Sequence, residues 1–315
     1  MSKPHLILGL GELLWDVLPE GPRLGGAPAN FSVMAGRLGN HAVILSRVGR
    51  DELGRQALAE LEHLDGMPAD ASFVQLDAGH ETGRVTVELD GGQPSYTIHD
   101  PVAWDFLKLS DEWVQLAERA GAVCFGSLGQ RNVRSRETIQ ALVGLTPEKC
   151  VRVFDVNLRG PFYSGEILQE SLELATVVKM NDAEVPLVLG LLGLETQVDS
   201  EVARGLDELR TGAMCLLREF PALKMVAVTR GGEGSLLVTR EDFHQHPGIA
   251  TNVVDTIGAG DAFTAAMTHY MLRGASLSLL NEAGNRWGSW VASQAGAMPV
   301  LPAMVHTQIA AAIEG

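Results

Sequence analysis

Four short apolar segments decide the fold of this 315-residue chain: AVCFGS (122–127), VRVFDVN (151–157), TVVKMN (176–181) and MVAVTR (225–230). Segments with a helical spacing of apolar residues precede and separate them, at 110–120, 134–145, 164–175, 182–190 and about 198–219. The apolar segments lack a polar–apolar alternation, which is typical of strands that are buried on both faces of a parallel sheet. The order therefore predicts an α/β fold with a doubly wound, mostly parallel sheet.

The N-terminal third continues this pattern and adds a ribbon. A strand, a helix, a strand and a helix are predicted in turn at 5–11, 29–38, 42–49 and 51–64. Residues 82–90 (TGRVTVELD) alternate with a period of two and can pair with 94–99 as a hairpin. No repeat or low-complexity linker interrupts the chain, so we expect one domain over 1–315 with a small β insertion.

Composition and charge exclude several classes of protein. Hydrophobic residues make up 46% of the chain, which is enough for a large core. Lys and Arg number 24 against 39 Asp and Glu, and the resulting charge of −15 repels phosphate backbones and anionic lipids. No apolar run reaches about 18 residues. We therefore expect no nucleic-acid partner, no membrane partner and no transmembrane helix.

The cysteines and the N-terminus favour a cytoplasmic protein. Cys124, Cys150 and Cys215 are widely spaced and form no CxxC pair, so neither a disulfide framework nor a zinc site is expected. The first residues, MSKPHLILGLGELLWD, combine a short apolar segment with early acidic residues, unlike a signal peptide.

The segment DTIGAGDAFTAAMTHYML (255–272) predicts an anion site. Gly258, Ala259 and Gly260 precede a predicted helix, and small residues there let backbone N–H groups approach an anion at the helix N-terminus. Asp261 lies in the first turn, where a carboxylate can accept the proton of a hydroxyl that attacks phosphorus. The structural alternative is an ordinary capping aspartate after a glycine-rich turn.

Five segments together resemble the PfkB, or ribokinase, family of carbohydrate kinases. DTIGAGDAF (255–263) resembles the family's C-terminal signature. The other four, in the family's order, are GGAPANFSVMAGRLG (25–39), VGRDELGRQ (48–56), KMNDAEV (179–185) and VTRGGEGS (228–235). The resemblance spans nearly the whole chain. It implies a ribokinase-like fold and ATP-dependent phosphorylation of a primary hydroxyl of a sugar.

The resemblance also implies which residues transfer the phosphoryl group. Asp261 would be the catalytic base. The amides of Ala259, Gly260 and Asp261, in the turn that begins with Gly258, would form the anion hole for the γ-phosphoryl group. FDVNLRGPFY (154–163) is similar to a segment of the fructokinase and ketodeoxygluconate kinase branches. It would place Arg159 near the sugar and the transferred group, whereas a surface salt bridge is the alternative for this arginine.

The nucleotide and cation sites are implied in the same way. Asn181 and Glu184 share a helix face and would hold Mg²⁺ through its water shell. The residues implied along the nucleotide are Thr229, Gly231, Gly234 and Asn285. A potassium site is a further hypothesis, formed by Asp255, Ile257, Ala292 and Gly296.

The sugar pocket and a β lid complete the implied site. The residues that would contact the sugar are Asp16, Gly25, Gly26, Asn30 and Asn157. A lid built from about 13–33 and 82–100 would add Thr82 and Tyr96, and such lids often pair between subunits, so a homodimer is a hypothesis.

Several alternatives stay open or are disfavoured. Fructose is the preferred substrate, with 2-keto-3-deoxygluconate, ribose or a nucleoside as alternatives, and a catalytically silent sugar-binding regulator or scaffold is the rival of a different class. Gly9-Leu10-Gly11 lacks the third glycine of a dinucleotide-binding fingerprint, because Leu14 stands there. The motifs GxxxxGK[ST] and GxSxG are absent from the sequence.

Overall fold

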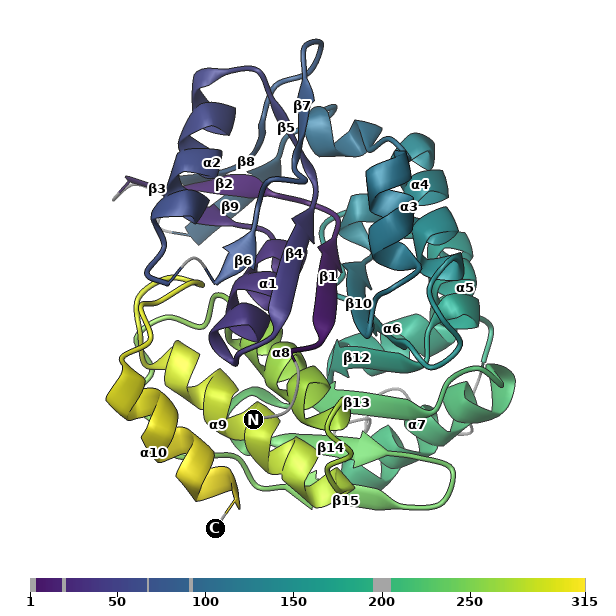
Figure 1. Cartoon of the computed structure of the whole chain (residues 1–315). Coiled ribbons are helices and arrows are strands. Elements are labelled where there is room, and N and C mark those ends of the chain that lie inside the picture. Colours follow the sequence, from purple (N-terminus) through teal and green to yellow (C-terminus); the bar gives the residue numbers. More distant parts are fainter. Residues whose placement is uncertain (1–3, 19–20, 67, 91–92, 195–204, 315) are drawn as a thin grey trace.

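A nine-stranded, mostly parallel sheet runs through the molecule (Figure 1). The computed structural model describes residues 4–18, 21–66, 68–90, 93–194 and 205–314. In spatial order, the strands are β15 (Phe243–His246), β14 (Ser235–Val238), β13 (Met225–Thr229), β12 (Val177–Asn181), β11 (Val151–Asp155), β10 (Ala122–Gly126), β1 (Leu6–Leu10), β4 (His41–Leu45) and β6 (Ala69–Asp70). The strands from β13 to β6 pair in parallel, and β14 and β15 are antiparallel. The predicted sheet is confirmed.

The chain order of the strands reverses at β1. From β1 the chain first builds outward through β4 and β6, and it later returns to the other side of β1 with β10. In open α/β sheets, ligands bind in the crevice beyond the carboxyl ends of the strands at such a reversal. The residues that follow β1, β10 and β11 therefore stand where a ligand is expected.

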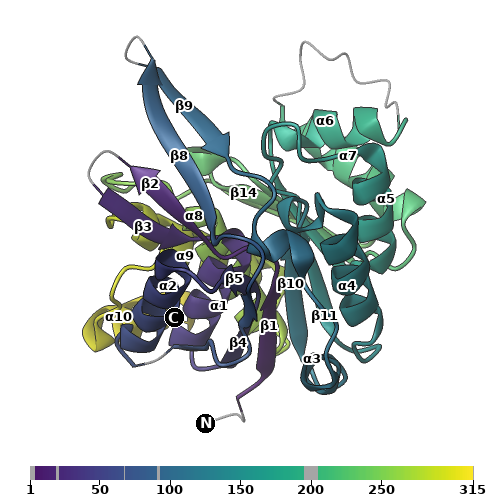
Figure 2. The same cartoon turned by 90° about the horizontal axis from the view of Figure 1, so that it is seen from above.

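Helices cover both faces of the sheet, as Figures 1 and 2 show. One face carries α1 (Ala27–Arg37), α2 (Glu52–His63), α8 (Ala259–Met271), α9 (Leu277–Ala292) and α10 (Ala303–Glu314). The other carries α3 (Asp111–Ala117), α4 (Val133–Gly144), α5 (Gly165–Leu174), α6 (Glu184–Leu191) and α7 (Leu206–Glu219). Each layer buries its own apolar cluster against the sheet. Of the helices in the described ranges, none combines the length and apolar character needed to cross a membrane.

The sequence-based expectations differ from the structure at one strand and in several missed elements. The single strand predicted over 42–49 is two strands, because the chain leaves the large sheet after β4 and pairs Arg47–Gly49 (β5) with Gln75–Asp77 (β7). The elements that were not predicted are β6, β7, β15, α9 and α10. The described part of the helix predicted from about 198 begins at Leu206, and residues 195–204 lie outside the described residues.

A separate four-stranded sheet rises beside the carboxyl edge of the large one (Figure 2). Its order is β3 (Gly21–Gly25), β2 (Leu14–Leu18), β8 (Gly83–Asp90) and β9 (Gln93–Ile98). The predicted β8–β9 hairpin is confirmed, with Val85 opposite Ile98. The lid range of 13–33 was too long, since the segment from Ala27 onward belongs to α1.

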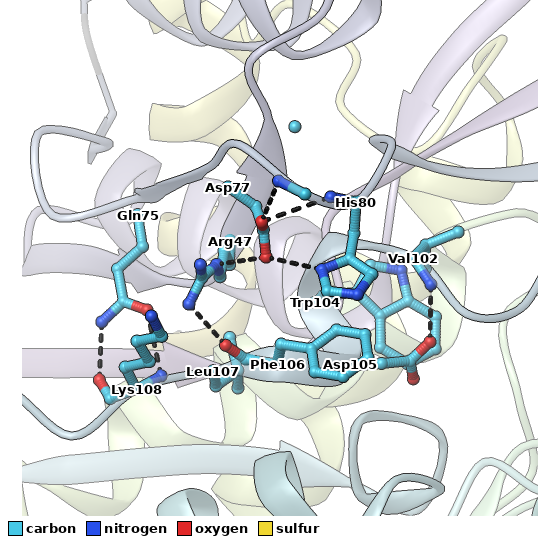
Figure 3. Close-up of polar contacts among 12 residues, drawn as sticks. Arg47, Gln75, Asp77, His80, Val102, Trp104, Asp105, Phe106, Leu107 and Lys108 are labelled. Atoms are coloured by element: carbon cyan, nitrogen blue, oxygen red, sulfur yellow. Dashed lines mark hydrogen bonds and ion pairs between the residues drawn. The ribbon is translucent and has the colours of Figure 1, made fainter.

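A buried polar cluster anchors the chain that leads into β8 (Figure 3). Arg47 Nε lies 2.9 Å from Asp77 Oδ2, and Arg47 Nη1 donates to the carbonyl of Phe106 at 2.7 Å. His80 Nδ1 is 3.1 Å from the same Asp77 oxygen, and its ring stacks on Phe106 with centroids 3.7 Å apart. The short helix η1 (Ala103–Phe106), which follows the β8–β9 hairpin, is thereby joined to β5 and β7, which precede it. These contacts hold the chain on both sides of the hairpin.

Candidate active site

The carboxyl edge of the large sheet gathers most of the predicted site residues. Asp16 lies on β2, Asn30 on α1, and Asp261 in the first turn of α8. Asn30 Nδ2 donates to Asp261 Oδ2 at 2.8 Å across 231 positions of sequence. The charge of Arg159, in the segment after β11, lowers the pKa of both Asp16 and Asp261 and so favours their charged forms. The structure thus brings the predicted base and sugar residues together.

Asp261 is the most perturbed of these groups. Burial and the nearby Asp155 raise the pKa of Asp261 to about 6, and Lys179, the Asn30 hydrogen bond and Arg159 oppose that rise. A carboxylate with this pKa is mostly ionised at neutral pH and can still take up a proton readily. This is the protonation behaviour that a general base requires.

The turn before Asp261 has the backbone shape that an anion site needs. Gly258 is the N-cap of α8, with a left-handed φ of 78°. Ala259 donates its amide to the Thr256 carbonyl at 3.3 Å. The amides of Gly260 and Asp261 belong to the first helical turn, whose N–H groups have no acceptor within the helix. These two amides and the helix dipole favour an anion at this end of α8.

A buried ion pair beneath this turn was not predicted. Lys179 Nζ on β12 lies 3.1 Å from Asp155 Oδ1, and Thr264 Oγ1 on α8 donates to Asp155 Oδ2 at 3.2 Å. A Cβ on Gly260 would stand 2.9 Å from Lys179 Nζ, so the ammonium packs directly under the turn. Burial alone would lower the pKa of Lys179, but Asp155 and Asp261 raise it. A lysine within an apolar strand sequence was the signal that could have identified it.

The other residues expected to contact the sugar lie on β2, on β3, at the start of α1 and after β11. Gly25 ends β3, and a Cβ there would stand 2.9 Å from Asp16 Oδ2, so the glycine backbone packs against this carboxylate. Gly26 is the N-cap of α1. Asn157 follows β11 with a left-handed φ of 41°, a strained conformation for a residue other than glycine.

Glu12 belongs to the same place and was missed by the sequence analysis. It lies two residues after the end of β1 and is only 2% exposed. Burial raises the pKa of Glu12 to about 7, and the Asp261 charge adds to the rise, while the backbone amide of Ala27 and the Arg159 charge oppose it. A glutamate directly after the apolar strand LILGLG was the available signal.

Asn181 ends β12 and Glu184 begins α6, so the two residues do not share a helix face as expected, but their side chains cap each other's backbone amides. Glu184 Oε2 accepts from the amide of Asn181 at 2.8 Å, and Asn181 Oδ1 accepts from the amide of Glu184 at 2.9 Å. Glu184 Oε1 accepts from the amide of Leu158 at 2.8 Å. Each carboxylate oxygen keeps further lone pairs for bound water. The pair therefore fits Mg²⁺ that keeps its water shell, and within the ranges that the structure describes no three His, Cys, Asp or Glu side chains gather as a closed metal site.

The residues expected along the nucleotide lie near the end of β13 and on α9. Thr229 ends β13, and Gly231 and Gly234 lie in and after the following turn. Asn285 is 7% exposed, and its Nδ2 donates to Ser235 Oγ at 2.7 Å and to the carbonyl of Asn281 at 2.8 Å. The side-chain nitrogen thus joins α9 to β14, and a contact of Asn285 with the nucleotide stays a prediction.

The structure corrects the expectation that Thr82 contacts the sugar. Its side chain is 0% exposed, donates to Asp51 Oδ1 at 2.6 Å and accepts from the amide of Gly49 at 2.9 Å. The hydroxyl therefore anchors β8 to the start of α2. Tyr96 lies on β9 opposite Val87, and its side chain is outside the described residues.

The residues expected to bind potassium form hydrogen bonds with one another, and one of them forms an ion pair with an arginine. Asp255 Oδ1 accepts from the amide of Ile257 at 3.0 Å, and Oδ2 accepts from Gly296 at 3.1 Å and from Arg23 Nη1 at 3.0 Å. The Ala292 carbonyl accepts from the amide of Asp255 at 3.2 Å. The Arg23 guanidinium already supplies a positive charge at Asp255 Oδ2, which disfavours a second cation at that oxygen. The potassium site stays a prediction.

Comparison with known proteins agrees with this geometry. The family described as pfkB family carbohydrate kinase matches residues 21–304. A putative sugar kinase of Pyrococcus horikoshii is 33% identical over 292 residues, covering 87% of this chain and 85% of the relative. A fructokinase of Escherichia coli is 31% identical over 319 residues, covering 93% and 95%.

A solved structure agrees as well. The crystal structure of an uncharacterised sugar kinase from Pyrococcus horikoshii in complex with ATP superposes with a TM-score of 0.75 at 30% identity, covering 93% of this chain and 94% of that one. The family match covers most of the chain and includes the turn at Gly258 and the Asp261 carboxylate. The chain therefore belongs to the pfkB family of carbohydrate kinases and is a sugar kinase.

Proposed function

We propose that this chain transfers the γ-phosphoryl group of ATP to a primary hydroxyl of a sugar, with fructose as the first candidate. The observation that carries the proposal is the 2.8 Å hydrogen bond between Asn30 and Asp261. This bond joins the first turn of α1, which follows Gly25 and Gly26, to the carboxylate next to the proposed anion-binding turn. Asn30, which we propose positions the sugar, is thus bonded to Asp261, which we propose accepts the proton.

Asp261 would act as general base. It would take the proton of the primary hydroxyl as the oxygen attacks the γ-phosphorus and the bond to ADP breaks. The amides of Gly260 and Asp261 would stabilise the charge on the transferred group. Arg159, whose charge already reaches Asp261, would neutralise part of that charge from the solvent side.

Lys179 would support the turn from below. Its ammonium lies under Gly260, and its charge favours the ionised form of Asp261. Asn181 and Glu184 would orient water around Mg²⁺ that arrives with the nucleotide. When bound, the metal neutralises phosphate charge. No further residue of the chain is needed to hold it.

Fructose is supported by the Escherichia coli fructokinase, which is similar along nearly the whole chain. Ribose, 2-keto-3-deoxygluconate and adenosine remain the alternatives within the family. The silent sugar-binding protein has less support, because Asp261, Asn181 and Glu184 keep the contacts that turnover would use. The paired subunits inferred for the small sheet remain a prediction.

An ATP-consumption screen with Mg²⁺ tests the proposal. Fructose, ribose, 2-keto-3-deoxygluconate and adenosine are offered to the wild type and to Asp261→Asn. Saturable turnover of fructose that is lost in the variant supports the assignment. Turnover of another sugar would replace the substrate, and sugar binding without turnover would support the silent protein.

A further inference from the structure

Glu12 carries a buried carboxylate oxygen with no internal partner. Its side chain is 2% exposed, and Oε2 has no hydrogen-bond partner among the residues that the structure describes. A buried polar atom of this kind is costly to leave unpaired, so its presence calls for a role. Asn30 Oδ1, on the amide whose nitrogen binds Asp261, is a second buried acceptor in the same condition.

The backbone around Glu12 places this oxygen at the ligand end of the sheet. A Cβ on Gly129, just beyond β10, would stand 3.3 Å from Glu12 Oε2. A Cβ on Gly26 would stand 2.4 Å from the carbonyl oxygen of Glu12. The glutamate therefore lies between the start of α1 and the segment after β10, where the strand order reverses.

Charge places the same group beside the reacting centre. The Asp261 carboxylate raises the pKa of Glu12, and the Arg159 guanidinium lowers it. Both charges are therefore close enough to act on Glu12, and both belong to the proposed phosphoryl-transfer site. A carboxyl group with a pKa of about 7 can accept or donate a hydrogen bond at neutral pH, as a sugar hydroxyl also can.

We propose that Glu12 is a sugar-binding and specificity-determining residue, and that its Oε2 pairs with a hydroxyl other than the one that is phosphorylated. Asn30 Oδ1 accepts from a second hydroxyl of the same ligand. Two unpartnered acceptors fit a polyhydroxylated ligand, which brings several O–H donors. The inference rests on the proposed function and extends it to the substrate contacts.

The specificity follows from what happens when the hydroxyl is missing. A site built to hydrogen-bond a hydroxyl rejects the analogue that lacks it, because the buried partner is then left unpaired. The wild type should therefore discriminate strongly against the one deoxy sugar that lacks the hydroxyl paired with Glu12. This loss should be specific to one carbon of the sugar.

Glu12→Gln is the test variant. The glutamine keeps the shape and one acceptor for the amide of Ala27, but replaces the unpartnered oxygen by a donor. Sugar binding is measured by calorimetry without ATP, using fructose, or whichever sugar of the screen binds, and its single deoxy analogues. Glu170→Gln on α5 is the matched control, because the Glu170 carboxylate also accepts from an N–H group, the side-chain amide of Gln140 at 2.7 Å, away from this site.

We expect Glu12→Gln to weaken sugar binding about 10- to 100-fold, as the loss of a hydrogen bond to a charged group does, with the KM for ATP unchanged. Discrimination against one deoxy analogue should disappear in the variant, while the control behaves as the wild type. Thermal melting reports folding, and Glu12→Ala serves if the glutamine still binds the hydroxyl.

The outcomes separate this inference from the proposed function. Unchanged sugar affinity in both folded Glu12 variants overturns the role of Glu12 and leaves the kinase assignment intact. If the wild type and the variant discriminate equally against every deoxy analogue, the role of Glu12 is likewise overturned and the kinase assignment stays intact. A wild type that binds none of the sugars overturns both.

Discussion

The buried Lys179–Asp155 pair should tune the acid limb of the pH–rate profile. Asp261 must be ionised to accept a proton, so kcat/KM should fall as the pH drops through its pKa of about 6. Lys179 lowers this pKa and Asp155 raises it. Removing the Lys179 charge should therefore move the acid limb to higher pH, and removing the Asp155 charge should move it to lower pH.

The magnitude follows from Coulomb's law. The ammonium lies under Gly260, the residue before Asp261. At an effective dielectric constant of about 20, a unit charge about 7 Å away is worth about 2 kcal/mol, or roughly 1.5 pH units. Solvent reduces this, so Lys179→Met should raise the midpoint of the limb by about one pH unit and Asp155→Asn should lower it by a similar amount.

The same variants should also lose stability. Breaking a buried pair costs about 3–5 kcal/mol because the remaining charge is left uncompensated. The double variant Asp155→Asn/Lys179→Met removes both charges, so it should melt above either single variant, with its limb near that of the wild type. The assay is kcat/KM for the sugar between about pH 5 and 8, with Glu170→Gln as the control. A limb that stays in place, or moves the same way in both single variants, would refute the electrostatic reasoning.

Three further predictions concern single positions. Asp261→Asn should reduce kcat by about 10²- to 10⁴-fold and leave the calorimetric sugar affinity near that of the wild type, since only the proton acceptor is lost; near-normal turnover would remove Asp261 as the base. Because the Arg23 charge disfavours a second cation at Asp255, wild-type turnover should be the same in potassium and in tetramethylammonium chloride, whereas selective activation by potassium would support the potassium site. Thr82→Val should lower the free energy of unfolding by about 1–3 kcal/mol, because the bonds of Thr82 to Asp51 and Gly49 are lost, with the sugar KM unchanged; a raised KM with normal melting would instead place Thr82 at the ligand.

Local patterns were sufficient for most of the parallel strands and for the main motif. Uninterrupted apolar segments identified the parallel strands, and the period-two ribbon identified the β8–β9 hairpin. The turn before Asp261 could be read directly, because its function depends on consecutive small residues and one carboxylate. The strand boundary was missed where the chain changes its pairing partner, between β4 and β5, since both strands are buried and local pattern does not show which strand each one pairs with.

The sequence by itself determined the α/β class and the family resemblance and pointed to Asp261 as the candidate base, because these signals reside in contiguous residues. Only the tertiary structure decided which polar side chains meet. Arg23 reaches Asp255 across 232 positions and Asn30 reaches Asp261 across 231, and neither contact has a local signature. The same packing buries the Thr82 side chain and leaves Glu12 Oε2 buried without a partner, within reach of the Asp261 charge. The physical reason is that burial and electric field at a side chain are set by every element packed around it, which no short segment of sequence specifies.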